Sequence, residues 1–235
     1  KTKIEWADAS WNPIRARNLK TGRVGWFCTH VSEGCANCYA EDWNLRLGNG
    51  LAYKPGHLKD VEIYLDEKVL EMPLRWRTPR KIFVCSMTDL FADFVRDEWI
   101  LAVAHVIAHT PHHIYQVLTK RPARMREVMR ATFETPPANL WLGVSVEDQA
   151  AADERIPILL GTRAAKRWLS CEPLLGPIDL SPWVGKISWT VVGGESGPRA
   201  RPMNPDWARS LRDQCAAAGV AFLFKQWGEY RKALP

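Results

Sequence analysis

The feature that most constrains the fold is a regular alternation of short apolar segments with segments of helical periodicity along a chain of 235 residues. Short apolar runs bounded by polar or small residues are typical of buried strands, and strands alternating with helices favour a parallel sheet covered on both faces. The predicted strands are Val24–Phe27, Lys81–Cys85, His113–Leu118, Leu140–Val144, Arg167–Leu169, Ile187–Val192 and Val220–Phe224.

The segments between these runs are predicted to be helices. Asn204 followed by Pro205 is typical of an N-cap with proline at the first helical position, and Gly219 is typical of a helix end. The predicted helices are Ala40–Leu47, Asp97–His109, Ala123–Arg130, Gln149–Leu160 and Pro205–Ala218.

Seven strands are one short of a complete eight-stranded barrel. We therefore expect an α/β fold with a partial, open β/α barrel of about six to seven parallel strands, in a single domain over residues 1–235. An open doubly wound sheet is the alternative, and periodicity alone does not separate the two. In both architectures the site lies where the strands end at their carboxyl edge.

The composition is that of a globular protein with a basic surface. Apolar residues make up 46% of the chain, and the formal net charge is +6. An excess of positive charge favours a polyanionic partner such as nucleic acid. Since no apolar run is long enough to cross a bilayer and no secretory signal is visible, we expect a cytoplasmic protein without a membrane partner.

Three of the six cysteines lie in one short segment, with the spacing C-x6-C-x2-C over Cys28, Cys35 and Cys38. In a cytosolic chain such a group indicates metal binding rather than disulfides. Three thiolates are one short of a closed site, and an iron–sulfur cluster held in this way keeps one iron open to a further ligand. Gly34 permits the close turn within the loop.

Other interpretations of the cysteines remain open. His30 lies inside the loop, so Cys28, His30, Cys35 and Cys38 are also candidates for a structural Cys₃His zinc site. A group of buried, unliganded thiols is a further alternative. Cys85, Cys171 and Cys215 are isolated in the sequence, and each is expected to be a small core residue.

Several motifs carry a resemblance to a known family. The segment Ile4-Glu5-Trp6-Ala7-Asp8-Ala9-Ser10-Trp11-Asn12-Pro13, the three cysteines and the segment Cys38-Tyr39-Ala40-Glu41 resemble a bacterial and phage family with a three-cysteine motif. That family looks like a divergent branch of the radical S-adenosylmethionine (radical SAM) superfamily, distantly similar to spore photoproduct lyase. The likeness extends over most of the chain, through the stretches Ser-Met-Thr-Asp, Leu-Thr-Lys-Arg-Pro, Gly-Val-Ser-Val-Glu, Cys-Glu-Pro-Leu and Gly-Gly-Glu-Ser-Gly.

The resemblance implies a partial barrel with a 4Fe–4S cluster on the loop after the first strand. It implies that S-adenosylmethionine binds the open iron and is cleaved to a 5′-deoxyadenosyl radical, with electrons from a donor such as flavodoxin or ferredoxin. Two departures stand out. The superfamily spacing is C-x3-C-x2-C, whereas the first gap here is longer. The Gly193-Gly194-Glu195 motif follows the sixth predicted strand instead of the second, so its role does not transfer.

The polar residues at the predicted strand ends are the candidates for binding the cofactor. Asp89 and Ser86 suit its ammonium group, and Lys120 suits its carboxylate. Ser145 and Glu147 suit the ribose hydroxyls. Glu172 suits a ribose or adenine donor, although a salt bridge is an equal alternative. The full set is Ser86, Asp89, Lys120, Ser145, Glu147, Glu172, Gly193, Gly194 and Glu195.

Basic residues and tryptophans occur close together in several stretches, a pattern typical of nucleic-acid grooves. Ordinary helix faces and core tryptophans explain the same pattern equally well. The basic stretches are Arg15–Arg23, Arg75–Lys81 and Lys120–Arg130, with Trp11, Trp26, Trp76 and Trp227 near such stretches.

Three functions are consistent with these observations. The first is a radical SAM enzyme that acts on a nucleotide or nucleic acid. The second is a zinc-stabilised nucleic-acid-binding module without catalysis. The third is an iron–sulfur electron carrier, whose closed site needs a fourth ligand such as His30.

Overall fold

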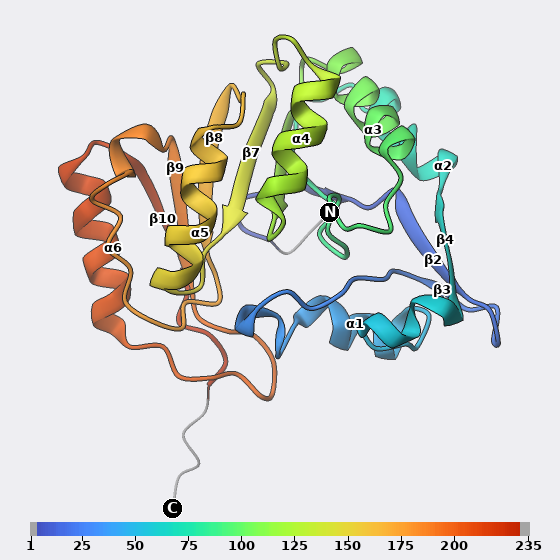
Figure 1. Ribbon diagram of the computed structural model, residues 1–235, viewed down its shortest axis with the longest axis horizontal. Coiled ribbons are helices and arrows are strands. Elements are labelled where there is room, and N and C mark those ends of the chain that lie inside the picture. The colour runs from blue at the N-terminus through green and yellow to red at the C-terminus, as the bar shows by residue number, and fades with distance from the viewer. Residues whose placement is uncertain (1–3, 231–235) are drawn as a thin grey trace, which may run out of the picture.

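The computed structural model describes residues 4–230, and its main feature is a seven-stranded sheet in which every neighbouring pair is parallel. The strand order is β1-β5-β6-β7-β8-β9-β10, which makes an open half-barrel with β1 and β10 at its edges (Figure 1). The strands are β1 Ala9–Trp11, β5 Lys81–Val84, β6 Ile114–Thr119, β7 Leu140–Ser145, β8 Lys166–Cys171, β9 Trp189–Gly193 and β10 Ala221–Gln226.

Helices connect most of the successive parallel strands, as the alternation in the sequence predicts. The bounds of α3 and α5 agree with the prediction, those of α1, α4 and α6 differ by one or two residues, and the four-residue α2 was not predicted. The helices are α1 Tyr39–Leu47, α2 Glu67–Leu70, α3 Asp97–His109, α4 Pro122–Thr132, α5 Gln149–Leu160 and α6 Pro205–Ala217. The prediction of an α/β partial barrel is therefore confirmed.

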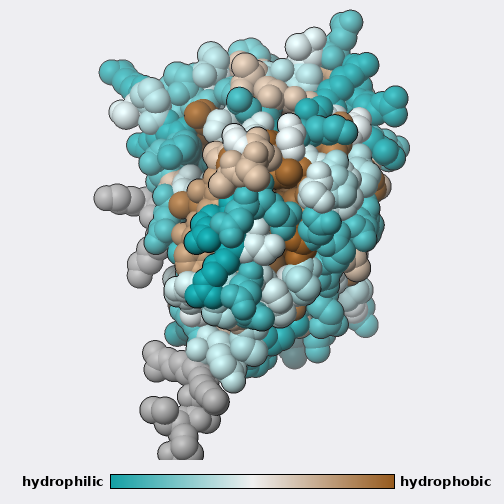
Figure 2. All heavy atoms as spheres, turned by 90° about the vertical axis from the view of Figure 1, so that its left-hand side faces the viewer, coloured by the Kyte–Doolittle hydropathy of each residue, from teal (hydrophilic) through white to brown (hydrophobic). Residues whose placement is uncertain are grey.

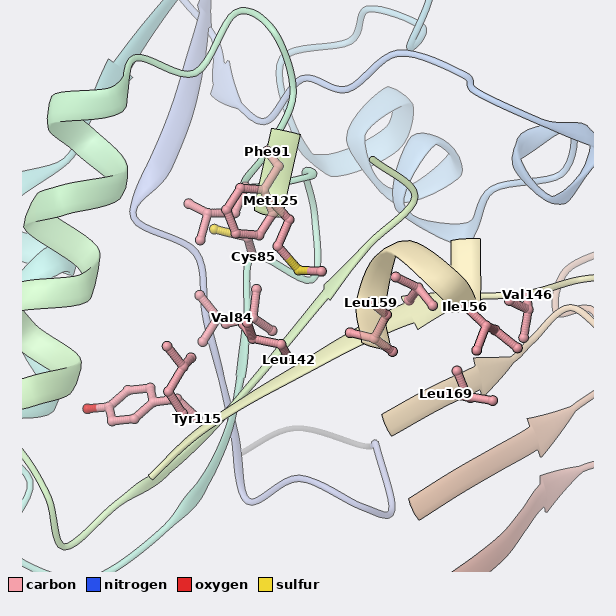
Figure 3. Close-up of a cluster of buried hydrophobic side chains, with 14 of the residues drawn as sticks. Val84, Cys85, Phe91, Tyr115, Met125, Leu142, Val146, Ile156, Leu159 and Leu169 are labelled. Atoms are coloured by element: carbon pink, nitrogen blue, oxygen red, sulfur yellow. The ribbon is translucent and has the colours of Figure 1, made fainter. Parts of the chain in front are cut away.

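The largest core lies between the sheet and the outer helices. Val84, Leu142 and Leu169 of the strands and Ile156 and Leu159 of α5 belong to one buried cluster (Figure 3), and all five side chains are completely buried. Burying an aliphatic side chain of this size contributes about 1.5–3 kcal/mol, so this layer is a main source of stability.

The opposite face of the sheet is filled by aromatic residues. Trp6 packs against Trp168 with ring centroids 5.3 Å apart, and Trp168 stacks on Trp189 at 5.1 Å. Gly143 makes room for this layer, because a Cβ there would lie 2.5 Å from the Trp168 ring. Much of the tryptophan in the chain is therefore structural.

One prediction about the sheet is wrong. Val24–Phe27 is not the first parallel strand, since β3 covers only Val24–Gly25 and belongs to a separate antiparallel sheet. That sheet has the order β3-β2-β4, with β2 at Ile14–Asn18 and β4 at Val61–Leu65. The first strand of the half-barrel is the three-residue β1, which is too short to be recognised from its apolar pattern.

The molecule presents a mixed surface at the β10 edge. Figure 2 looks onto the side that carries β10 and α6, where hydrophobic residues in the middle of the face are bordered by hydrophilic ones. Residues of β10 are only partly buried, as expected of an edge strand. No helix within residues 4–230 has the length and apolar character needed to span a bilayer.

Candidate functional site

The three cysteines lie on one loop, residues 28–38, that leads from β3 into α1. A short 3-10 turn, Glu33–Cys35, shapes its middle, and Cys38 is the N-cap residue of α1. Figure 1 shows α1 across the end of the sheet toward which the β7 arrow points. The cysteine loop, as we call residues 28–38, therefore lies at the carboxyl edge of the half-barrel, although it does not follow a strand of the main sheet.

All three thiols of the loop are half-buried, and none is in a disulfide. Cys28 and Cys38 interact electrostatically, and so do Cys38 and Cys35. Burial, with a smaller contribution from Asp89, raises the pKa of Cys28 to about 12. Burial also raises the pKa of Cys38, although the backbone N–H groups of Glu41 and Ala40 at the start of α1 act in the opposite direction.

Within residues 4–230, no group of three or more His, Cys, Asp or Glu side chains is gathered so that it could hold a metal ion. In a cubane cluster each thiolate binds a different iron, so the three sulfurs do not need to converge on one point. Thiolate is the ligand type of iron–sulfur clusters, so the three sulfurs of the loop are candidate cluster ligands by their chemistry.

His30 is paired with an acid of α1 in this arrangement. Its Nε2 lies 2.9 Å from Oε2 of Glu41, and the other oxygen of Glu41 accepts a hydrogen bond from the backbone N–H of Tyr53 at 2.8 Å. The pair with Glu41 engages Nε2 and leaves Nδ1 as the ring nitrogen open to a metal ion, and a carboxylate on the second ring nitrogen commonly supports a metal-bound histidine.

Asp89 anchors the beginning of the cysteine loop through Arg121. The buried carboxylate accepts hydrogen bonds from Thr119 Oγ1 at 2.8 and 2.9 Å and from the backbone N–H of Lys120 at 3.0 Å, and it pairs with Arg121 at 3.1 Å. Arg121 in turn donates to the carbonyl and the hydroxyl of Thr29, at 3.0 and 2.6 Å. Asp89 thus positions the residue next to Cys28.

Glu147 holds the middle of the loop. This buried carboxylate pairs with Arg155 of α5 at 2.9 Å and accepts a hydrogen bond from the hydroxyl of Ser32. Although burial acts in the opposite direction, Lys120, Ser32 and Arg155 lower the pKa of Glu147. A Cβ at Gly34 would lie 3.0 Å from this carboxylate. Gly34 thus leaves room for the close approach of the loop to Glu147, and it does so without a positive φ.

Glu195 holds the end of the loop. It pairs with Arg201 at 2.6 Å and accepts a hydrogen bond from the side-chain amide of Asn37 at 3.0 Å. Burial raises the pKa of Glu195, but the hydrogen bonds from Arg201 and Asn37 outweigh it and lower the value. Arg201 also donates to the carbonyl of Glu33 at 2.8 Å. The glutamate of the Gly-Gly-Glu motif thus binds the cysteine loop.

Three acid–arginine pairs therefore fasten the loop at its beginning, middle and end. The three acids were predicted from their places at strand ends as cofactor-binding residues rather than as loop anchors, and Arg155 was not predicted at all. The available signal was an arginine within the buried stripe of α5 formed by Ala151, Ala152, Ile156 and Leu159. A buried carboxylate needs such a partner, because an unpaired charge in the interior is costly.

Glu172 and the two glycines of the motif form a neighbouring group near β10. Glu172 pairs with Lys225 at 2.5 Å and accepts from Gln226 at 3.1 Å. A Cβ at Gly193 would lie 3.3 Å from Glu172, and one at Gly194 would lie 2.1 Å from the carbonyl oxygen of Trp227. The glycines therefore allow close packing between the ends of β9 and β10.

The remaining candidates differ in how far their side chains are engaged. The hydroxyl of Ser86 exchanges hydrogen bonds with Asn12 at 3.2 and 3.3 Å. The side chains of Lys120 and Ser145 have no hydrogen-bond or ion-pair partner within residues 4–230, although Lys120 acts electrostatically on Cys38 and Glu147. Lys120 is thus the free cation of this group next to the cysteines.

Comparison with known proteins identifies the family but no characterised relative. No curated protein and no solved structure matches the chain. The model of the family described as "Protein of unknown function (DUF5131)" matches residues 1–234. The chain therefore belongs to the DUF5131 family.

Proposed function

We propose that the chain is a radical SAM enzyme, with a 4Fe–4S cluster on Cys28, Cys35 and Cys38, that acts on a nucleotide or nucleic-acid substrate in modification or repair. The observation that carries the proposal is that three unpaired thiols, on one loop, lie at the carboxyl edge of an open parallel half-barrel. This edge is where such sheets place their sites, and three thiolates leave one iron available to a cofactor.

When bound, the cluster supplies the electron that cleaves S-adenosylmethionine to methionine and a 5′-deoxyadenosyl radical, which abstracts a hydrogen atom from the substrate. The protein has to hold the loop, orient the cofactor and exclude water. The three acid–arginine pairs perform the first task, because they fasten the loop through Thr29, Ser32 and Asn37.

Lys120 is the residue best suited to bind the carboxylate of the cofactor. Its side chain has no partner within residues 4–230, and it acts on Cys38 and Glu147 from close by. Ser86 and Ser145 offer hydroxyls to the ammonium and ribose groups. Asp89, Glu147 and Glu195 are saturated by protein donors, so their contribution is to position the loop, and each would meet the cofactor only by exchanging a partner.

The aromatic layer around Trp168 supports water exclusion, since it fills the face of the sheet opposite the outer helices. Ser145 and Ser170 are paired in register on β7 and β8, and Ser170 lies two residues beyond Trp168. Alternate residues of a strand share a face. The two serines therefore line the same face as the tryptophan layer, closer to the carboxyl edge.

The test is anaerobic reconstitution with iron and sulfide, followed by reduction and addition of S-adenosylmethionine. We expect visible absorbance typical of an iron–sulfur cluster and formation of 5′-deoxyadenosine. Cys35→Ala should abolish both signals. Cys215→Ala should retain them, because Cys215 is a buried residue of α6.

Other results would contradict the proposal. Stoichiometric zinc with no cofactor cleavage under reduction would favour the zinc-stabilised binding module. A cluster that is reduced and reoxidised without cofactor cleavage would favour an electron carrier. Equal loss of the cluster in Cys215→Ala and Cys35→Ala would show that the loop is not its specific ligand.

A further inference from the structure

The exposed aromatic side chains of the molecule are confined to two segments. Trp43 is 57% exposed, Trp227 54%, Tyr230 48% and Tyr39 42%, and every other aromatic side chain within residues 4–230 is buried or half-buried. Tyr39 and Trp43 lie one turn apart on α1, directly after Cys38, and Trp227 and Tyr230 follow β10. We call these four residues the aromatic rim.

Contacts join the two segments of the aromatic rim. Arg199 pairs with Asp42, the neighbour of Trp43, at 3.2 Å. In the same loop, the backbone N–H of Gly197 donates to Glu229, the neighbour of Tyr230, at 2.6 Å. The loop after β9 therefore contacts both α1 and the segment after β10, and it joins the two segments of the aromatic rim at the carboxyl edge.

Two rings of the aromatic rim are held on one side and open on the other. The hydroxyl of Tyr39 donates to the carbonyl of Ser86 at 2.7 Å, and Trp227 packs against Phe224 with ring centroids 4.5 Å apart. A ring fixed in this way loses little conformational entropy when a flat ligand stacks on its free face.

Four half-buried aromatic residues differ, because an arginine covers a face of each ring. None of the four rings of the aromatic rim has such a cover among residues 4–230. The covered pairs are Arg15 over Trp26 at 4.5 Å, Arg17 over Tyr64 at 5.1 Å, Arg80 over Trp76 at 4.6 Å and Arg96 over Trp99 at 4.9 Å. Of the four tryptophans expected in basic grooves, Trp11 is buried, Trp26 and Trp76 are covered, and Trp227 alone is exposed.

We infer that the aromatic rim is a stacking surface for the unpaired bases of a single-stranded nucleic acid. Exposed rings stack on bases of any sequence, while a duplex hides its base faces from them. The chain has a net charge of +6, which favours a polyanion, and Arg46 of α1 and Lys120 have side chains without partners within residues 4–230. Arg46 follows Trp43 by one turn of α1, and Lys120 follows β6 at the same carboxyl edge of the sheet.

The inference rests on the proposed function, because that proposal supplies nucleic acid as the substrate class. The test of the inference is independent of the proposed function. Binding by the aromatic rim requires neither the cluster nor cofactor cleavage. Loss of cleavage with intact binding would therefore contradict the proposed function alone, and intact cleavage without binding would contradict the stacking surface alone.

The experiment is fluorescence anisotropy of the full chain with labelled single-stranded DNA, single-stranded RNA and duplex DNA of about 20 nucleotides, a length that covers several stacked bases. We expect one or both single strands to bind more tightly than the duplex, and the comparison of DNA with RNA identifies the source. Trp43→Ala and Trp227→Ala should each weaken single-strand binding by about tenfold, the equivalent of one lost stacking contact. Trp43→Phe should restore most of it.

Two variants serve as controls. Leu101→Ala removes an exposed apolar side chain from α3, and Lys186→Ala removes a positive charge from the 3-10 turn Val184–Lys186, which precedes β9 at the opposite, amino edge of the sheet. Both should leave single-strand binding nearly unchanged. Three results would overturn the inference. The first is equal affinity for duplex and single strands, and the second is unchanged binding in both tryptophan variants. The third is a chain that binds no nucleic acid but self-associates in a way that Trp43→Ala abolishes.

Discussion

Glu195, at the end of β9, accepts a hydrogen bond at 3.0 Å from Asn37, which lies 158 positions earlier in the chain between two of the clustered cysteines. Arg201 pairs with the same carboxylate at 2.6 Å and reaches the carbonyl of Glu33. The contact joins the Gly-Gly-Glu motif to the cysteine loop. The Gly-Gly-Glu motif, which follows the sixth predicted strand, therefore positions the cysteine loop.

Glu195→Gln should weaken this attachment. The pKa of Glu195 is lowered from its ordinary value of 4.5, so the ionised group stabilises the fold above about pH 4.5 and this contribution is lost as the pH falls through the lowered pKa. We expect the substitution to reduce the free energy of unfolding by about 1–3 kcal/mol near neutral pH, since Arg201 is partly exposed. Urea unfolding at several pH values measures this, and a difference from wild type that did not shrink in acid would contradict it.

Glu147→Gln should be more damaging, because its partner Arg155 is completely buried. Removing one member of a buried pair leaves the other charge uncompensated and costs about 3–5 kcal/mol. The matched control is Asp206→Asn, which breaks an exposed pair with Arg209 and should change stability by less than about 1 kcal/mol. Thermal unfolding of both variants measures which one loses more stability. Similar losses in stability would contradict the burial of the pair between Glu147 and Arg155.

Gly194→Ala should disrupt the junction of β9 and β10. The new Cβ would lie 2.1 Å from the carbonyl oxygen of Trp227, a contact with backbone that cannot move freely. We expect a loss of about 1–3 kcal/mol, typical of overpacking at a buried position. Gly185→Ala, which meets nothing within 4 Å, serves as the control and should be nearly neutral in chemical denaturation. Equal stability of the two variants would argue against the close approach.

Cys28 should alkylate slowly in the folded protein free of metal. Burial raises its pKa to about 12, so the thiol stays protonated at neutral pH, and its reaction with iodoacetamide should accelerate as the pH rises toward that value. Peptide mass spectrometry after timed labelling measures the rate, with the protein unfolded in guanidinium chloride as the reference. A rate equal to that of the unfolded chain at about pH 8 would show that the thiol is not buried.

Local pattern was sufficient to predict most secondary structure. The bounds of α3 and α5 follow from apolar periodicity, and the carboxyl ends of β5 to β9 coincide with the polar stretches selected as candidates. The prediction failed at Val24–Phe27, because a short apolar run looks the same in an antiparallel hairpin and in a parallel sheet. Only the partner strand distinguishes them, and the partner is distant in sequence.

The sequence by itself determined the α/β half-barrel, the spacing of Cys28, Cys35 and Cys38, and the set of acids at the strand ends. Only the tertiary structure decided that Asp89, Glu147 and Glu195 pair with arginines and fasten the cysteine loop, and that Tyr39, Trp43 and Trp227 are exposed. The physical reason is that periodicity records which way a side chain points from its own element. Charge pairing and solvent exposure depend on which other segments pack against that side chain. The residues that make these contacts are far apart in sequence, as Asn37 and Glu195 are at 158 positions.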